Sequence, residues 1–262
     1  MLDTYPTKGM RWPAWVKQRL AFHGAPLGIL LTERMPNPGV RPYLPGCVAN
    51  ATTWSVPVRY KIVPGLNDTS IFASDGDKMT PAVVEAAVEL VREGAQLITC
   101  NCGYSIRFQQ AVRDAVDVPV FLSSLLLAPF LEKMLPASQA LGIIVASKSA
   151  LTQDMLVASG LRADIGRRVV IAGLEDTPVF GDAWVTPSGD LDVGGCQADV
   201  VNTAVALQEE RPDIGMLLLE CGDLPPFTHA VQQATQIPVF DFTSMVEFFI
   251  GGLVRKPFTG LI

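Results

Sequence analysis

The chain has 262 residues, of which 49% are hydrophobic and 18% are charged, and its mean hydropathy is +0.31. This length and composition are typical of one large α/β domain or two smaller ones, each with a buried core. The net charge is −6, and the sequence has no Lys/Arg cluster with interleaved aromatic residues, which argues against a nucleic-acid partner.

The most apolar segment, 118–135, is interrupted by Pro129 and Glu132 and is too short to span a bilayer. The N-terminal residues lack the apolar core of a signal peptide. We therefore expect no membrane partner and a cytoplasmic location, in which the five cysteines stay reduced.

Short apolar runs predict, in chain order, β-strands over 26–33, 95–101, 118–124, 140–147, 168–173, 215–220 and 237–242. Helical patterns lie between many of them. One spans 80–95, with Thr80 and Pro81 at its start and Gly94 at its end, and another spans 196–213. This alternation predicts an α/β fold with parallel sheets, helices on both faces, and ligands at the carboxyl ends of the strands.

Segment 34–76 is rich in Pro, Gly, Asn and Thr. We expect it to form a long functional loop or an excursion from the sheet. Within it, residues 56–63 alternate as a strand does and leave Arg59 exposed.

An internal repeat is the most informative feature of the sequence. Residues 102–121 align without gaps with residues 221–240, with nine identities in twenty positions. The alignment pairs Cys102 with Cys221, whereas Cys100 pairs with a leucine. Two structurally equivalent halves explain this better than coincidence does. We therefore predict a pseudo-twofold molecule made of two α/β units.

In each repeat a Cys-Gly pair falls between the end of a strand and the start of a helix. A helix N-terminus stabilises a thiolate, and Gly103 and Gly222 let backbone amides approach a bound anion. With Cys102 and Cys221 face to face, one thiolate removes a proton from a carbon α to a carboxylate, and the other thiol protonates the opposite face. The sequence therefore indicates Cys102 and Cys221 as a catalytic acid–base pair for a small carboxylate.

The cysteines also allow other roles. A buried cysteine is most often an inert small hydrophobe, and this is the interpretation for Cys47, Cys100 and Cys196. A zinc site is not expected, because the chain has only two histidines and no second close cysteine pair. A dithiol redox role would favour Cys-x-x-Cys spacing.

Segments 94–104 (GAQLITCNCGY) and 215–227 (GMLLLECGDLPPF) resemble the two cysteine signatures of the aspartate/glutamate racemase superfamily. In this register the catalytic cysteines of the superfamily fall on Cys102 and Cys221. The resemblance implies two Rossmann-like domains with the active site in the cleft between them. It also implies that the protein needs no cofactor and forms a homodimer.

The resemblance further implies that the chain crosses between domains twice, so that 1–122 and 240–262 form the first domain and 123–239 the second. Members of the superfamily bind the substrate carboxylate with hydroxyls and amides on strand-end loops, which here implies the substrate-binding residues Asn50, Thr53, Ser124 and Ser147. The chain departs from the signatures directly after each cysteine, and the residues found there are also expected to contact substrate: Gly103, Tyr104, Gly222 and Asp223.

Together these features predict a cofactor-independent racemase or epimerase that inverts a carbon α to the carboxylate of a small amino acid or related acid. Two alternatives stay open. One is a decarboxylase or cis–trans isomerase of a small dicarboxylate on the same fold, and the other is a non-catalytic ligand-binding relative.

Overall fold

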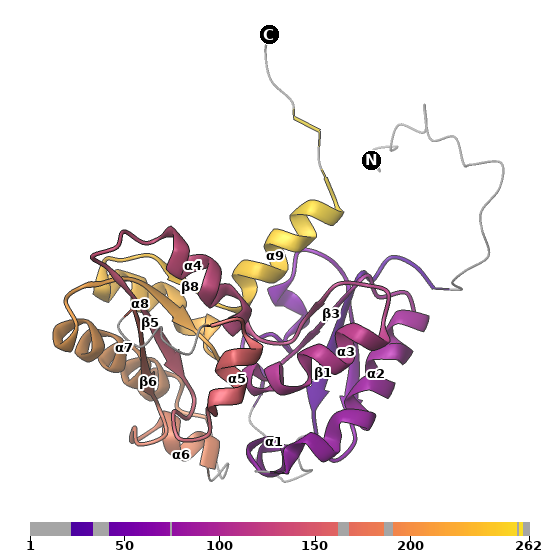
Figure 1. Cartoon of the computed structure of the whole chain (residues 1–262), viewed down its shortest axis with the longest axis horizontal. Coiled ribbons are helices and arrows are strands. Elements are labelled where there is room, and N and C mark those ends of the chain that lie inside the picture. The colour runs from indigo at the N-terminus through magenta and orange to yellow at the C-terminus, as the bar shows by residue number, and fades with distance from the viewer. Residues whose placement is uncertain are drawn as a thin grey trace, which may run out of the picture.

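Two parallel sheets, one in each half of the chain, form the framework of the protein (Figure 1). The computed structural model describes residues 22–33, 42–73, 75–161, 168–185, 191–255 and 257–258. The first sheet has the order β2-β1-β3-β4, formed by Val58–Val63, Leu27–Thr32, Leu97–Cys100 and Val120–Phe121. The second has the order β6-β5-β7-β8, formed by Val169–Gly173, Ala140–Val145, Ile214–Leu219 and Val239–Phe240.

Both sheets therefore share one topology, and every strand pair in the described residues is parallel. The two cysteine signatures occupy equivalent strands, because β3 precedes Cys102 and β7 precedes Cys221. The prediction of two related α/β units with parallel sheets is confirmed.

The helices flank these sheets. The α-helices of the described residues are α1 (Asp68–Phe72), α2 (Thr80–Arg92), α3 (Gln109–Ala115), α4 (Ala128–Met134), α5 (Gln153–Ala158), α6 (Phe180–Val185), α7 (Val193–Glu210), α8 (Thr228–Thr235) and α9 (Phe242–Leu253). Short 3-10 helices link them to the strands: η1 (Ala51–Thr53), η2 (Gly76–Met79), η3 (Gly103–Phe108), η4 (Ser124–Leu127) and η6 (Pro225–Phe227).

Local sequence explains where the predicted helices begin and end. Helix α2 ends before Gly94, whose φ of +101° is costly for residues with a side chain. Helix α7 begins at Val193, earlier than the expected start at 196, because the Asp192 side chain caps it by accepting a hydrogen bond from the backbone N–H of Gly195 at 2.9 Å.

Segment 34–76 differs from the expectation of an excursion. Part of it forms β2, the edge strand of the first sheet, which pairs along its whole length with β1. Two basic residues of β2 form ion pairs with α2: Arg59 with Glu93 at 3.6 Å, and Lys61 with Glu89. The alternating pattern of the strand is therefore the stronger signal. Residues 34–41 lie outside the described part of the chain.

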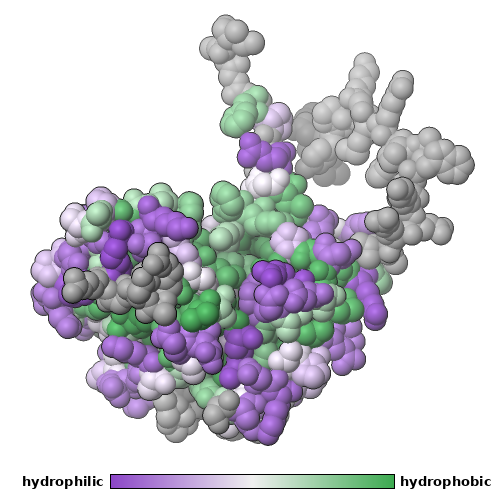
Figure 2. All heavy atoms as spheres, in the orientation of Figure 1, coloured by the Kyte–Doolittle hydropathy of each residue, from purple (hydrophilic) through white to green (hydrophobic). Residues whose placement is uncertain are grey.

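Helix α9 returns to the first sheet, where its apolar residues Phe242, Val246 and Ile250 join a core cluster with Leu27 and Phe121. The predicted division into 1–122 plus 240–262 and 123–239 requires such a return, and the division itself stays a prediction. Apolar residues reach the surface around α9 (Figure 2), where Phe248 is 78% exposed. In the part of the chain that the structure describes, no helix combines the length and apolarity needed to cross a membrane.

Candidate active site

Cys102 and Cys221 occupy the same kind of turn in the two halves. The carbonyl oxygen of Cys102 accepts a hydrogen bond from the N–H of Ser105 at 3.0 Å, and that of Cys221 accepts one from Leu224 at 3.0 Å. Each turn leads into a 3-10 helix, which is followed by an α-helix. The α-helix that we expect after each cysteine is therefore preceded by a short 3-10 helix. The equivalence predicted by the gapless alignment therefore extends to backbone geometry.

The two turns pack against each other across the pseudo-twofold axis. A Cβ atom on Gly103 would lie 1.8 Å from Oε1 of Glu220, and one on Gly222 would lie 2.2 Å from the carbonyl oxygen of Asn101. Each glycine therefore touches the residue that precedes the cysteine of the other half. This packing by itself requires glycine at both positions, and the anion contacts expected of Gly103 and Gly222 stay predictions.

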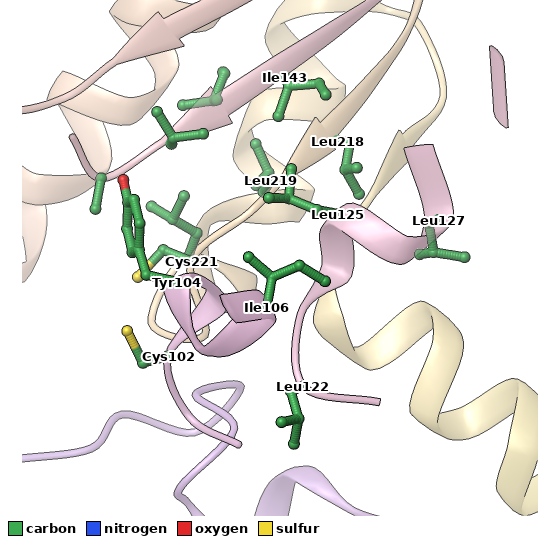
Figure 3. Close-up of a cluster of buried hydrophobic side chains, with 14 of the residues drawn as sticks. Cys102, Tyr104, Ile106, Leu122, Leu125, Leu127, Ile143, Leu218, Leu219 and Cys221 are labelled. Atoms are coloured by element: carbon green, nitrogen blue, oxygen red, sulfur yellow. The ribbon is translucent and has the colours of Figure 1, made fainter. Parts of the chain in front are cut away.

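The thiols lie at this junction. Cys102 is 8% exposed and Cys221 is 3% exposed. Figure 3 shows the sulfur of Cys221 beside Tyr104 and the sulfur of Cys102 on the same side of the junction, and ionisation of either thiol raises the pKa of the Tyr104 hydroxyl. The structure thus brings together the predicted catalytic pair and one predicted substrate-binding residue.

Tyr104 also joins the two halves. Its hydroxyl donates a hydrogen bond to the carbonyl oxygen of Ser147 at 2.6 Å and accepts one from the N–H of Ser147 at 2.8 Å. Burial raises the pKa of Tyr104 far above its ordinary value, and the nearby Glu220 raises it further. The phenol therefore stays protonated as a hydrogen-bond donor.

Cys100 is a strand residue of the first sheet and is 1% exposed. Its sulfur lies 3.0 Å from Oγ of Ser105, and burial raises the pKa of its thiol above the ordinary value. Desolvation disfavours the thiolate of Cys100.

Glu220 is the most unusual ionisable residue of the site. Its side chain is fully buried, and neither carboxyl oxygen has a hydrogen-bond partner among the described residues. Burial raises the pKa of Glu220 to about 8. Its repeat equivalent Asn101 is satisfied instead, because its side chain accepts from the N–H of Thr32 at 2.9 Å and donates to Oγ1 of Thr32 at 3.1 Å.

Several predicted substrate-binding residues have hydrogen bonds within the fold. Oγ of the fully buried Ser124 donates to the carbonyl oxygens of Leu219 and Glu220, both at 3.1 Å, and so fixes the second signature strand. Oγ of Ser147 lies 2.9 Å from Oγ of Ser149. Their roles in substrate binding stay predictions.

Asn50 and Thr53 shape the loop over the second turn. Asn50 caps η1, and Oγ1 of Thr53 donates to the carbonyl oxygen of Cys47 at 2.8 Å. The same loop docks on the second signature, because the N–H of Val48 donates to the carbonyl oxygen of Gly222 at 2.9 Å. These side chains therefore position the loop, and substrate contact by either one stays a prediction.

Asp223 lines a pocket between this loop, α6 and α7 of the second half, and the second signature turn. The residues that line this pocket include Leu44, Cys47, Phe180, Cys196, Asp223 and Phe227. Among the described residues, no group of three or more His, Cys, Asp or Glu side chains is arranged to bind a metal ion.

Sequence reasoning did not place Phe180 or Phe227 in the site and did not commit to Glu220. The signal for Glu220 was available, because it precedes Cys221 and aligns with Asn101 in the gapless repeat. Phe180 reaches the pocket only through the tertiary fold, and no motif marks it.

Solved structures of other proteins share this fold. The glutamate racemase of Bacillus anthracis has a TM-score of 0.58 and 11% identity, covering 88% of this chain and 82% of that chain. Allantoin racemase of Pseudomonas fluorescens has a TM-score of 0.56 and 16% identity, with coverages of 87% and 91%. Arylmalonate decarboxylase has a TM-score of 0.52 and 16% identity, with coverages of 86% and 92%. The protein has the fold of the aspartate/glutamate racemase superfamily, as its cysteine signatures predicted.

Sequence comparison identifies the family more narrowly. The chain is 32% identical over 262 aligned residues to the dimethylsulfoniopropionate lyase of Durusdinium sp. clade D, covering 95% of this chain and 84% of that protein. It is 29% identical over 214 residues to dimethylsulfoniopropionate lyase 7 of Emiliania huxleyi (strain CCMP1516), where the match covers 78% of this chain and 61% of that protein. The chain belongs to the dimethylsulfoniopropionate lyase family. No family model matches the chain.

The prediction of a racemase or epimerase, and with it the isomerase class, is wrong. These relatives are lyases, and the racemases share only the fold at low identity. The alternative of a decarboxylase is nearer, since a decarboxylase is itself a lyase. A shared fold does not fix the reaction that a site performs.

Proposed function

We propose that the protein is a lyase that cleaves dimethylsulfoniopropionate by β-elimination. The observation that supports this most is the 32% identity to a dimethylsulfoniopropionate lyase over 95% of the chain. The paired thiols are the second support, because elimination starts with removal of a proton α to a carboxylate, the chemistry for which their arrangement is suited.

The proposed reaction uses one thiolate as a base. It removes a proton from the α-carbon of the substrate, and the C–H electron pair forms the bond between the α- and β-carbons. The bond between the β-carbon and sulfur breaks, and its electrons leave with neutral dimethyl sulfide. The other product is acrylate, and the proton stays on the cysteine until solvent removes it.

The surroundings of the thiols favour this chemistry. Both cysteines are buried, which limits the access of water to the reacting carbon. Glu220 stays neutral below about pH 8, so it adds no negative charge that would oppose a thiolate or the carboxylate of the substrate.

The test is the release of dimethyl sulfide from dimethylsulfoniopropionate, measured by gas chromatography of the headspace. The wild-type chain should release it. Serine in place of at least one of Cys102 and Cys221 should lower kcat by about 100-fold or more, the typical contribution of a general base. C100S is the matched control and should stay within about threefold of wild type. The proposal fails if wild type is inactive or if both C102S and C221S keep full activity.

We further propose, from the sequence alone, a cytoplasmic homodimer that acts on a small carboxylate without a cofactor. Gel filtration with light scattering measures the oligomeric state, and dialysis against a chelator measures whether activity depends on a metal.

A further inference from the structure

The pocket beside Asp223 combines a carboxylate with two aromatic rings. It is open to solvent on one side and is lined by Phe180, Phe227 and Asp223 together with aliphatic and thiol side chains. The mechanism above assigns no role to this pocket.

The aromatic walls are fixed by the fold. The buried carboxylate of Asp199 on α7 accepts hydrogen bonds from the N–H groups of Val179 at 2.7 Å and Phe180 at 2.8 Å. Phe227 ends η6, and its N–H donates to the carbonyl oxygen of Leu224 at 2.9 Å. Phe180 and Phe227 are only 3% and 4% exposed, so their rings need little reorganisation on ligand binding.

The pocket adjoins the thiol junction. Asp223 is two residues after Cys221, and the loop that forms the opposite wall is hydrogen-bonded to Gly222 through Val48. That loop also fits tightly at Gly46, where φ is +101° and a Cβ atom would lie 3.0 Å from the nitrogen of Pro226.

We propose that this pocket binds the methylated cationic end of the substrate, with Asp223 as the counter-ion and Phe180 and Phe227 as the rings against which the methyl groups pack. The inference rests on the proposed function, because it assigns the sulfonium group of that substrate to a subsite. Asp223 is then a specificity-determining residue.

The chemistry of the cation supports this assignment. A dimethylsulfonium group has no N–H or O–H, so a protein recognises it by opposite charge, by the faces of aromatic rings and by apolar contact with its methyl groups. The pocket offers all three. In the substrate a single carbon separates the sulfur from the α-carbon, and Asp223 is two residues after Cys221, so a sulfonium beside Asp223 keeps the α-carbon close to the second signature turn.

The test compares the binding of two ligands of the same shape by isothermal titration calorimetry. One is 3-(trimethylammonio)propanoate, and the other is 4,4-dimethylpentanoate, in which carbon replaces the charged nitrogen. Wild type should bind the cation at least about tenfold more tightly, as expected for a partly desolvated cation between a carboxylate and aromatic rings.

Two substitutions locate the preference. D223N and F227L should each reduce the preference for the cation over 4,4-dimethylpentanoate to about threefold or less. Both variants should keep the affinity of wild type for 4,4-dimethylpentanoate. The control D182N changes an exposed aspartate on the neighbouring helix α6 and should keep the full preference. Circular dichroism shows whether each variant folds. If D223N does not fold, F227L and the wild-type preference decide the question.

The inference is overturned if wild type binds both ligands equally or if folded D223N and F227L keep the wild-type preference. Its failure is distinct from that of the proposed function. Loss of the preference in D223N without any release of dimethyl sulfide by wild type would retain the cation subsite and reject the lyase. If wild type releases dimethyl sulfide and both variants keep the preference for the cation, the lyase function is retained and the cation subsite is rejected.

Discussion

The carboxyl group of Glu220 links the site to the stability of the protein. Its pKa is about 8 in the folded protein, against an ordinary value of 4.5. The folded protein therefore keeps a proton that the unfolded chain loses above about pH 4.5. Because unfolding releases this proton, the group lowers the free energy of unfolding as the pH rises between these two values, and its effect levels off above about pH 8.

E220Q should remove this dependence. The amide has the same shape and does not ionise, so the variant should gain stability relative to wild type between pH 5 and pH 8.5, by at most about 5 kcal/mol. Urea unfolding at the two pH values measures the change. The exposed Glu209 supplies the control, because E209Q should follow wild type at both. Equal pH slopes for E220Q and wild type would contradict a raised pKa at Glu220.

The sequence predicts the residues of the site unevenly. The repeat alone selects Cys102 over Cys100, and in the structure Cys100 lies within β3 whereas Cys102 lies in the turn that follows this strand. Asn50 and Thr53 were selected for their polar groups, yet those groups fold their own loop. Residue type indicates which side chains are able to bind a carboxylate, whereas the partner that each one finds depends on tertiary packing.

At the scale of elements, β2 shows how two signals in one segment compete. The Pro, Gly and Asn content of 34–76 predicts a loop, whereas alternation over 56–63 predicts a strand. The strand forms because its backbone pairs with β1 and its basic residues reach glutamates on α2. Composition averaged over the segment is therefore a weaker guide than the short pattern within it, which the neighbouring elements stabilise.

Helix α9 depends on one buried cap. Oδ1 of Asp241 accepts from the N–H of Thr243 at 2.8 Å, and Oδ2 accepts from Oγ1 of Thr228 at 2.5 Å. D241A should therefore lower the free energy of unfolding by about 1 to 2 kcal/mol, because it removes the cap and leaves Thr228 without this acceptor.

D241N is the matched control for this cap. It keeps a side-chain oxygen that accepts from the helix N-terminus, so it should lose less stability than D241A in urea unfolding. Equal losses in the two variants would show that the cap contributes little.

At the scale of the whole molecule, the glycines join the two halves. G222A should lower the free energy of unfolding by about 1 to 3 kcal/mol and impair catalysis, because the new methyl group would overlap the carbonyl oxygen of Asn101. The control G251A adds a methyl group on α9 where no atom lies within 4 Å, and it should be neutral or stabilising. Urea unfolding and the headspace assay measure both effects, and a G222A variant that unfolds and reacts as wild type would contradict the overlap.

The overall architecture was predictable because the sequence is duplicated, and each copy of the repeat indicates the same local structure. Strand–helix alternation and the alignment of Cys102 with Cys221 lead to the same pseudo-twofold model. The reaction class was not predictable in this way, because a thiol that removes an α-proton serves inversion and elimination equally. The atoms that distinguish these reactions belong to the substrate, and the repeat carries no information about them.

The reciprocal contacts of Gly103 with Glu220 and of Gly222 with Asn101 also bear on how the two halves can move relative to each other. They join the halves beside the reacting atoms, so the halves cannot swing apart there without separating the thiols themselves. The spacing of the two turns is therefore set by local contacts, in which Gly222 meets the main chain of Asn101 and Gly103 meets both the side chain and the main chain of Glu220. The loop that Asn50 and Thr53 shape is hydrogen-bonded to Gly222 through Val48, so a change at Gly222 disturbs the contact between the halves and the attachment of this loop together.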